Sequence, residues 1–345
     1  MKKSIFISFL IKPSIVCWYV IVLLSGCSRG LHSSPNMVQV QLEDAVDDGM
    51  DGIIVCINQP NGTQLYAAGW NNREEQIHAN PHTLFKIASI SKLYLAAATT
   101  LLISEEKLSL DQTLAELIPE VEGKIQYANE ITLRLMLQHR SGIPDYIFEE
   151  QVNGETYNDY LSFVARIYDK SAVFKPDEKY RYSNSNFLLI GEILDRTLGY
   201  SHHIYIHELI IEPLGLSNTY NVPGEVDMQE VMSGYLRGSE SDVKDWEYHL
   251  PGGSMIASAQ DVSIFLRALI DGTLLSPEQQ AIYTSVYPYE HTGWLPGYTS
   301  IARYHPDIDA VVVQFVNTSG KEIYWVKLKR VYRRIIRILK EDNQI

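Results

Sequence analysis

Apolar runs alternate with short polar turns along the chain, and the spacing within each run predicts its secondary structure. Apolar residues recur at helical intervals from Val38 to Val46, and a continuous apolar run of strand length follows at Ile53 to Ile57. An Asn61-Gly62 turn separates this run from a second strand-like run, Leu65 to Trp70. The first part of the chain therefore predicts a helix followed by a β-hairpin.

A second group of strands is predicted near the C-terminus. Three apolar segments, 289–294, 298–304 and 310–316, are separated by turns that contain Pro and Gly or Asp, which is typical of an antiparallel meander. The closing segment, Lys321 to Lys340, is a basic amphipathic helix. We expect it to pack on the sheet with its basic face in solvent, and contact with an anionic membrane surface is the alternative.

The middle of the chain reads mainly as helices and loops. The expected fold class is therefore α+β with two lobes: an antiparallel sheet from both chain ends flanked by helices, and an inserted, mostly helical lobe at about residues 101–249. With 345 residues, 46% hydrophobic and 21% charged, the chain suits one compact catalytic unit with its active site between the lobes. Its net charge of -13 argues against nucleic acid as a partner.

A Ser-x-x-Lys motif joins Ser89 to Lys92 inside an apolar run that extends from Leu84 to Ile103. This run predicts a buried helix, on which residues i and i+3 are neighbours, so Lys92 can lie beside the Ser89 hydroxyl. A desolvated lysine loses proton affinity and can act as a base. The alternative is that the Lys92 stem is buried while its ammonium reaches solvent. Ser-x-x-Lys also occurs at Ser104 and Ser241, in polar segments.

Two further motifs follow in order. Tyr182 and Asn184 stand just before an apolar helix, Ser185 to Leu194, that ends near Gly199, so a loop can aim both side chains into a cleft. Asn184 also suits the helix N-cap, and the two roles are compatible. The third motif, His291-Thr292-Gly293, opens the meander, where a glycine on an edge strand allows a substrate backbone to approach closely.

Together these segments resemble the class C β-lactamase-related serine hydrolases, with a β-lactamase/transpeptidase-like fold. That family includes penicillin-binding D-Ala-D-Ala carboxypeptidases, β-lactamases, D-amino-acid peptidases and esterases. The resemblance runs from about Leu42 to Asn317. It is carried by the three motifs and by four other segments: Leu137 to Tyr146, Tyr182 to Gly199, Glu212 to Leu216, and Gly252 to Asp261.

The resemblance implies a role for each motif residue. Ser89 would be the nucleophile, Lys92 its base partner, and Tyr182 a proton shuttle that takes the hydroxyl proton on acylation and activates water on deacylation. Independently of the resemblance, we expect nearby Lys92 and His291 to lower the pKa of Tyr182. Asn184 would orient the substrate amide or the lysine. His291, Thr292 and Gly293 would bind substrate on their strand, and the backbone N–H groups of Ser89 and Trp294 would form the oxyanion hole.

The third motif departs from the Lys-Thr-Gly that class C β-lactamases typically carry. A histidine is only partly charged near neutral pH, so it would hold a substrate carboxylate less strongly than lysine. We therefore expect a D-Ala-D-Ala carboxypeptidase-like peptidase or an esterase, acting on a small peptide, amide or ester without a cofactor. A peptidoglycan stem peptide or a β-lactam is a candidate substrate. A true β-lactamase and a non-catalytic lipoprotein that binds peptidoglycan or a partner are the alternatives.

The N-terminal segment predicts location. Met1-Lys2-Lys3, an apolar core from Ile15 to Leu24 and the lipobox-like Leu24-Ser25-Gly26-Cys27 predict a lipoprotein signal peptide over residues 1–26. Cys27 would carry the lipid, residues 27–36 would form a tether, and residues 37–345 the hydrolase domain. This predicts an envelope protein anchored to a membrane, facing the periplasm from the outer membrane in a Gram-negative organism.

One cluster of histidines could in principle bind a metal ion, but its sequence signal is weaker than that of the three motifs. His202, His203 and His207 lie near Glu208 and include an i, i+4 pair, but no HExxH or CxxC motif accompanies them. We interpret them as surface histidines of a helix and expect no metal site.

Overall fold

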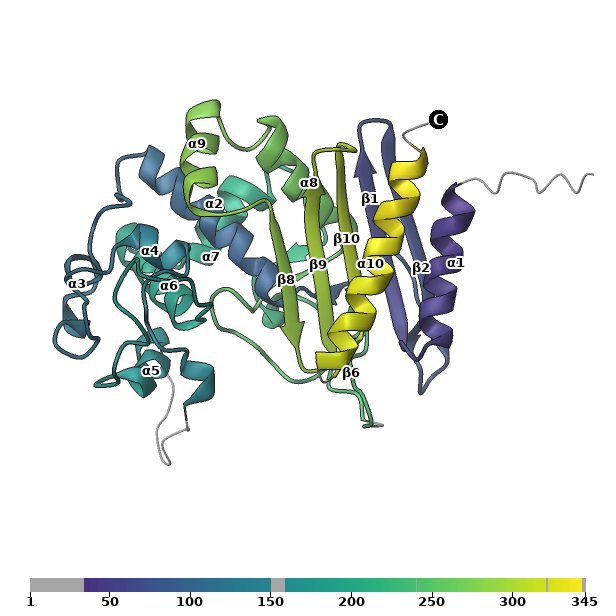
Figure 1. Ribbon diagram of the computed structural model, residues 1–345, viewed down its shortest axis with the longest axis horizontal. Coiled ribbons are helices and arrows are strands. Elements are labelled where there is room, and N and C mark those ends of the chain that lie inside the picture. The colour runs from purple at the N-terminus through teal and green to yellow at the C-terminus, as the bar shows by residue number, and fades with distance from the viewer. Residues whose placement is uncertain (1–33, 150–158, 240, 321, 343–345) are drawn as a thin grey trace, which may run out of the picture. The chain divides into compact units, whose positions relative to one another are not determined.

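A six-stranded antiparallel sheet organises the protein, in the order β3-β2-β1-β10-β9-β8 (Figure 1). The computed structural model describes residues 34–149, 159–239, 241–320 and 322–342. The N-terminal hairpin, β1 (Gly52–Gln59) with β2 (Gly62–Asn72), meets the C-terminal meander where β1 pairs with β10. The predicted hairpin and meander are confirmed. The remaining strands of the sheet are β3 (Ile77–His78), β8 (Glu290–Leu295), β9 (Tyr298–His305) and β10 (Ala310–Val316).

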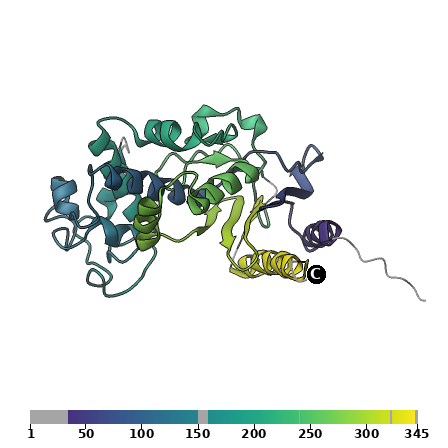
Figure 2. The same ribbon diagram turned by 90° about the horizontal axis from the view of Figure 1, so that it is seen from above.

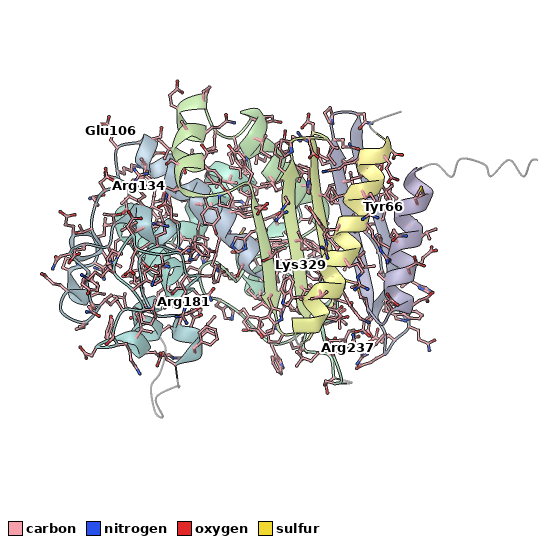
Figure 3. The ribbon with its side chains drawn as sticks, in the orientation of Figure 1. Tyr66, Glu106, Arg134, Arg181, Arg237 and Lys329 are labelled. Carbon is pink, nitrogen blue, oxygen red and sulfur yellow. The ribbon has the colours of Figure 1, made fainter. Side chains whose placement is uncertain are left out.

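Helices cover both faces of this sheet (Figure 2). On one face lie α1 (Ser34–Asp47) and α10 (Glu322–Asp342), and on the other lies α8 (Ala259–Asp271). Because the central strands are covered on both sides, every residue of β10 is buried, which explains its unbroken apolar sequence. Leu328 of α10 packs on the sheet, whereas Lys329, labelled in Figure 3, is exposed. The terminal helix therefore packs on the sheet, as expected.

A mostly helical region lies beside the sheet and completes the predicted two-lobed α+β fold. Its boundaries as a separate lobe stay a prediction. The helices are α2 (Ser91–Ser104), α3 (Leu114–Leu117), α4 (Leu133–Leu137), α5 (Tyr160–Val164), α6 (Ser185–Leu198), α7 (His202–Ile206) and α9 (Pro277–Val286), with a π-helical turn at His207–Ile211. Single 3-10 turns occur at Ala88–Ile90, Pro119–Val121, Tyr146–Phe148, Ala165–Ile167, Pro223–Glu225 and Met228–Glu230.

Short strands join the two regions. A three-stranded sheet contains β4 (Phe85–Lys86), β7 (Ile256–Ala257) and β5 (Thr219–Tyr220), while β6 (Tyr235–Leu236) pairs with β11 (Thr318–Ser319). The expectation of one buried helix from Leu84 onwards is therefore wrong for its first part. Phe85–Lys86 pair with β7, and Ala88 has a left-handed φ of 53°, which no α-helix continues.

The N-terminal predictions lie outside the described residues, since Cys27 and the proposed signal peptide precede Ser34. In the part of the chain that the structure describes, none of the helices combines the length and apolarity needed to cross a membrane.

Candidate active site

Ser89 lies in the 3-10 turn that leads directly into α2, so its side chain stands at the start of a buried helix. The preceding residue, Ala88, holds a strained left-handed backbone, a feature that concentrates at functional sites. The edge strand β8 runs against this turn because Gly293 has no side chain. A Cβ on Gly293 would collide with the carbonyl oxygen of Ile87 and the hydroxyl of Ser300. Close packing of the strand beside Ser89 thus gives this glycine a structural reason, and the approach of a substrate backbone stays a prediction.

Lys92 is fully buried, and its amine contacts three oxygen atoms. The Nζ atom lies 3.1 Å from Ser89 Oγ, 3.0 Å from Asn184 Oδ1 and 2.7 Å from the carbonyl oxygen of Gly252. Burial lowers the pKa of Lys92 to about 7, and the nearby Asp145 carboxylate opposes that shift. The alternative that the Lys92 ammonium reaches solvent is wrong.

These contacts suit Lys92 to the role of a base. The oxygens of Asn184 and Gly252 accept hydrogen bonds only, so they fix two N–H groups of the amine. When the amine is neutral, its lone pair is left to face Ser89 Oγ and can accept the hydroxyl proton. A pKa near 7 makes that neutral form abundant at neutral pH.

Tyr182 lies on the other side of the serine hydroxyl, with its Oη atom 3.0 Å from Ser89 Oγ. Burial raises the pKa of Tyr182 well above its usual value, and the Asp145 charge adds to the rise, while the Ser89 hydrogen bond opposes it. The expectation that Lys92 and His291 lower the pKa of this phenol is therefore wrong. Both neighbours have lowered pKa values themselves, so neither supplies a dependable positive charge.

Asn184 occupies the N-cap position of α6 but makes no capping hydrogen bond with its side chain. Its Oδ1 accepts from Lys92, and its Nδ2 donates to Asp145 Oδ2 at 2.9 Å. Asn184 therefore contacts the lysine, and its role in orienting the lysine or the substrate amide stays a prediction. Asp145 is not among the predicted site residues, although it lies in one of the segments that carry the resemblance.

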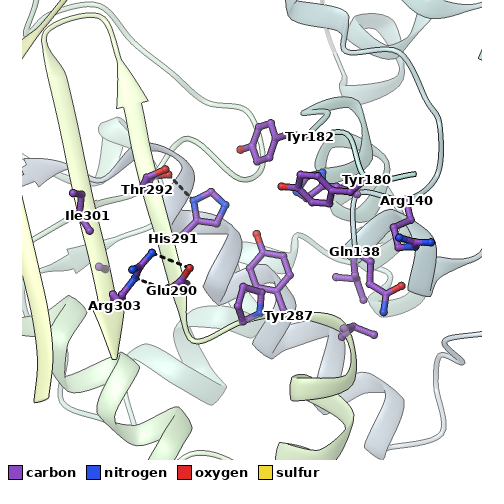
Figure 4. A pocket seen from close by; sticks show the side chains of 15 residues that line it. Gln138, Arg140, Tyr180, Tyr182, Tyr287, Glu290, His291, Thr292, Ile301 and Arg303 are labelled. Atoms are coloured by element: carbon purple, nitrogen blue, oxygen red, sulfur yellow. Dashed lines mark hydrogen bonds and ion pairs between the residues drawn. The ribbon is translucent and has the colours of Figure 1, made fainter. Parts of the chain in front are cut away.

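His291 is neutral in this site. Burial, and after it the charge of Lys92, lower the pKa of His291 to about 3. Its Nδ1 lies 2.6 Å from the carbonyl oxygen of Thr292, so Nδ1 carries the proton and Nε2 is an acceptor (Figure 4). The expected partial charge at neutral pH is thus wrong. The ring stands 6.0 Å from that of Tyr182 and 6.1 Å from that of Tyr287.

Two cavities meet at this point. The larger, of about 960 Å³, contains Ser89, Asn184 and Trp294 and has an aromatic wall formed by Tyr146, Phe148, Tyr160, Phe163 and Tyr248. The smaller, of about 470 Å³, is drawn in Figure 4, and its lining includes Arg140, Tyr180, Tyr287, Glu290 and Arg303. Tyr182, His291 and Thr292 line both cavities. A substrate bond at Ser89 would therefore have separate space on its two sides.

The structure thus brings together the residues of all three motifs. Trp294 is an exposed residue, with 46% of its surface accessible, and its backbone lies on β8 beside the Ser89 turn. The histidine cluster differs from expectation: His202 is fully buried, with Nδ1 2.7 Å from Asp195 Oδ1, so it is not a surface residue. Among the described residues, His, Cys, Asp and Glu side chains form no group that could hold a metal ion.

Comparisons with known proteins identify the family. The family described as Beta-lactamase matches residues 40–287. Protein flp of Staphylococcus aureus (strain COL) is 29% identical over 206 residues, which are 58% of this chain and 41% of that protein. The chain thus spans less than half the length of that relative.

Two solved structures share the fold. The D-amino acid amidase from Ochrobactrum anthropi SV3, complexed with L-phenylalanine amide, has a TM-score of 0.78 and 22% identity, covering 90% of this chain and 99% of that one. A class C beta lactamase from Rhodobacter sphaeroides has a TM-score of 0.73 and 21% identity, covering 90% and 100%. The family match covers most of the chain, and residues of all three motifs lie around one cavity. The chain belongs to the beta-lactamase family of serine hydrolases.

Proposed function

We propose that this protein hydrolyses small amides or esters through an acyl-enzyme on Ser89. One observation carries the proposal: the Ser89 hydroxyl stands between Lys92 Nζ at 3.1 Å and Tyr182 Oη at 3.0 Å. A serine hydroxyl is a weak nucleophile until a positioned base takes its proton. A binding protein has no chemical need for that arrangement.

The pKa values support one assignment of proton transfers. Neutral Lys92 accepts the Ser89 proton as the serine oxygen bonds to the substrate carbonyl carbon. Tyr182, still protonated, gives its phenolic proton to the leaving nitrogen or oxygen as the acyl bond breaks. One transfer from the Lys92 ammonium to the Tyr182 phenolate then resets both groups. In the second half, water gives a proton to Lys92 and its oxygen bonds to the acyl carbon, while the departing Ser89 oxygen takes the proton of Tyr182. A second transfer from the Lys92 ammonium to the Tyr182 phenolate restores the free enzyme.

The two cavities support an assignment of substrate parts. The larger cavity contains Ser89 and an aromatic wall, which suits an apolar or aromatic acyl group. The smaller cavity would take the leaving group. Its cations are already paired, Arg140 with Asp177 at 2.6 Å and Arg303 with Glu290. With His291 neutral, this favours an uncharged amide or ester, such as an amino-acid amide, over a substrate with a carboxylate near the scissile bond.

A D-Ala-D-Ala carboxypeptidase is the second candidate. Arg303 lies in the smaller cavity with His291, and a peptide carboxylate that displaced Glu290 would pair with it. Carboxypeptidase activity therefore requires Arg303 to exchange Glu290 for the substrate carboxylate, whereas cleavage of an uncharged amide requires no such exchange. β-Lactamase activity needs a comparable exchange for the β-lactam carboxylate.

The test is intact-protein mass spectrometry of residues 28–345 after exposure to a fluorophosphonate, to benzylpenicillin, and to amide and ester substrates. The Ser89→Ala variant is run alongside. We expect fluorophosphonate labelling and turnover of amides or esters, both lost in the variant. A persistent penicilloyl adduct would favour the penicillin-binding peptidase, and turnover of penicillin a β-lactamase. If neither labelling nor turnover is observed, the enzymatic proposal is wrong and an envelope binding protein becomes the leading alternative.

The proposed location is the cell envelope, with the chain held to a membrane by a lipid on Cys27. The basic start, the short apolar core and the Leu24 to Cys27 lipobox support it. Metabolic labelling with a fatty acid should mark the full-length protein and not a Cys27→Ser variant. Equal labelling of both would contradict lipidation at Cys27.

A further inference from the structure

His139 has no part in the steps above, yet it is one of the most constrained residues beside them. It follows α4, is 4% exposed, and has a left-handed φ of 55°. Its Nε2 atom is buried with no hydrogen-bond partner among the described residues. A strained backbone and an unpaired buried polar atom both cost stability. Because His139 carries both costs and lies beside Tyr182, we infer that the position of His139 serves a function.

His139 holds the backbone on both sides of Tyr182. The carbonyl oxygen of His139 accepts a hydrogen bond from the Arg181 N–H at 3.0 Å. Its ring Nδ1 accepts from the Ser183 N–H at 3.3 Å. The imidazole also stacks on the Tyr182 ring, with centroids 4.4 Å apart and an interplanar angle of 29°. Tyr182 is thus fixed by its two neighbours in the chain and by its own ring.

A second residue fixes the imidazole itself. Asn186 Nδ2 lies 3.3 Å from His139 Nδ1, and Asn186 Oδ1 accepts from the Ser141 hydroxyl at 2.7 Å. Because Nδ1 faces two N–H donors, it must be unprotonated, and the ring proton sits on Nε2. Burial is the main cause that lowers the pKa of His139 to about 3, and it keeps this tautomer neutral. Asn186 is fully buried, so the whole support is rigid.

We propose that His139 is a positioning residue that sets the Tyr182 hydroxyl for proton transfer to the leaving group. This inference rests on the proposed function and assigns a role to a residue outside its proton-transfer steps. Tyr182 lies in a loop before α6, so its Oη position depends on the contacts that His139 makes. A displacement of about 1 Å at a catalytic group can cost about 10² in rate.

The leaving group separates this role from a merely structural one. An amine leaves an acyl carbon only when it is protonated, so cleavage of an amide depends on the Tyr182 proton. A 4-nitrophenolate is stable as an anion and leaves without that proton. A misplaced Tyr182 should therefore slow acylation by an amide and spare acylation by an activated ester. Deacylation also uses the Tyr182 proton, but it is common to the two substrates. Partial unfolding would reduce both acylation rates equally.

The experiment compares kcat/KM, which reports acylation and not deacylation, for a 4-nitroanilide and a 4-nitrophenyl ester of one acyl group, using the full-length protein in detergent. Four variants are compared: His139→Ala, His139→Asn, Tyr182→Phe and, as an exposed control, His82→Ala. Asparagine tolerates the left-handed backbone and can present an acceptor to Ser183 without the ring. Thermal melting of each variant reports folding separately.

We expect His139→Ala to lower kcat/KM for the anilide by about 10- to 100-fold and kcat/KM for the ester by less than about threefold. The rate of His139→Asn on the anilide should lie between those of His139→Ala and wild type. If the alanine variant does not fold, the asparagine variant still provides the test. Tyr182→Phe should show the same selective loss for the anilide. His82→Ala should lose activity on neither substrate. Equal losses on both substrates, or none in a folded variant, would overturn the inference. Absence of Ser89-dependent turnover in the wild type would overturn the proposed function, and this inference with it.

Discussion

Lys92 Nζ donates a hydrogen bond of 2.7 Å to the carbonyl oxygen of Gly252, a residue 160 positions later in the chain. This contact does more than satisfy the amine. Together with Asn184 it uses two N–H groups and leaves the remaining direction toward Ser89. Gly252 itself has a left-handed φ of 75° and packs closely against the lysine stem. The orientation of the base is therefore set by a loop distant in sequence.

Gly252→Ala should displace this base. A Cβ at Gly252 would stand 2.9 Å from Lys92 Cγ and 3.2 Å from Nζ, and the left-handed backbone adds strain. We expect kcat to fall by about tenfold or more, with a lower melting temperature. Gly253→Ala is the matched control, since its Cβ would meet only the Leu250 carbonyl at 3.8 Å. A folded Gly252→Ala enzyme with wild-type kcat would contradict this role.

The pH dependence of kcat/KM should report the lysine. The catalytic form of Lys92 is the neutral amine, which prevails above its pKa of about 7. Activity should therefore be low in acid and rise through about pH 7 to a plateau. His139 and His291 have pKa values of about 3, so neither adds a limb near the usual histidine value. A limb centred near pH 10 would instead show that the amine of the free enzyme stays charged.

The sequence predicts the parts of the site that depend on local spacing. Ser89 and Lys92 meet because they are three residues apart at a helix start, and the β8 to β10 meander follows from its alternating apolar runs and turns. The three motifs also indicate the family, since each brings a different chemical group to one place.

Other features depend on contacts between distant segments and have no local signal. Gly252 and Asp145 approach Lys92 and Asn184 only in the folded chain. The direction of the Tyr182 pKa shift depends on burial, which the sequence does not show, rather than on the charges of Lys92 and His291. The left-handed Ala88, which interrupts the predicted helix before Ser89, is a residue type that rarely adopts this conformation.

Lys86→Met should weaken substrate binding more than catalysis. Lys86 is buried, and its Nζ donates to the carbonyl oxygens of Lys244 and Trp246 at 2.5 and 2.6 Å. These bonds hold the segment that carries Tyr248 to the wall of the larger cavity. Methionine fills similar volume but leaves both carbonyls without their donor, so we expect a several-fold rise in KM and a lower melting temperature. Lys244→Met, which removes a charge from the same segment but keeps both bonds, should change KM little. Equal KM values in the two variants would contradict the role of Lys86.

Cys56 should react with thiol reagents only when the sheet opens. The side chain is fully buried in β1, burial raises the pKa of its thiol to about 12, and Ser263 Oγ lies 3.3 Å from Sγ. The thiolate is the reactive form, so both its low population and its lack of access protect it. In residues 28–345 this is the only cysteine, which makes Ellman's reagent a specific probe. We expect no reaction in buffer, one equivalent in guanidinium chloride, and none in either condition for Cys56→Ser. Labelling in buffer at the rate of a free thiol would show that the β1 region opens locally while the rest stays folded. In that case the sheet that supports β8 and the third motif would be less rigid than its packing implies.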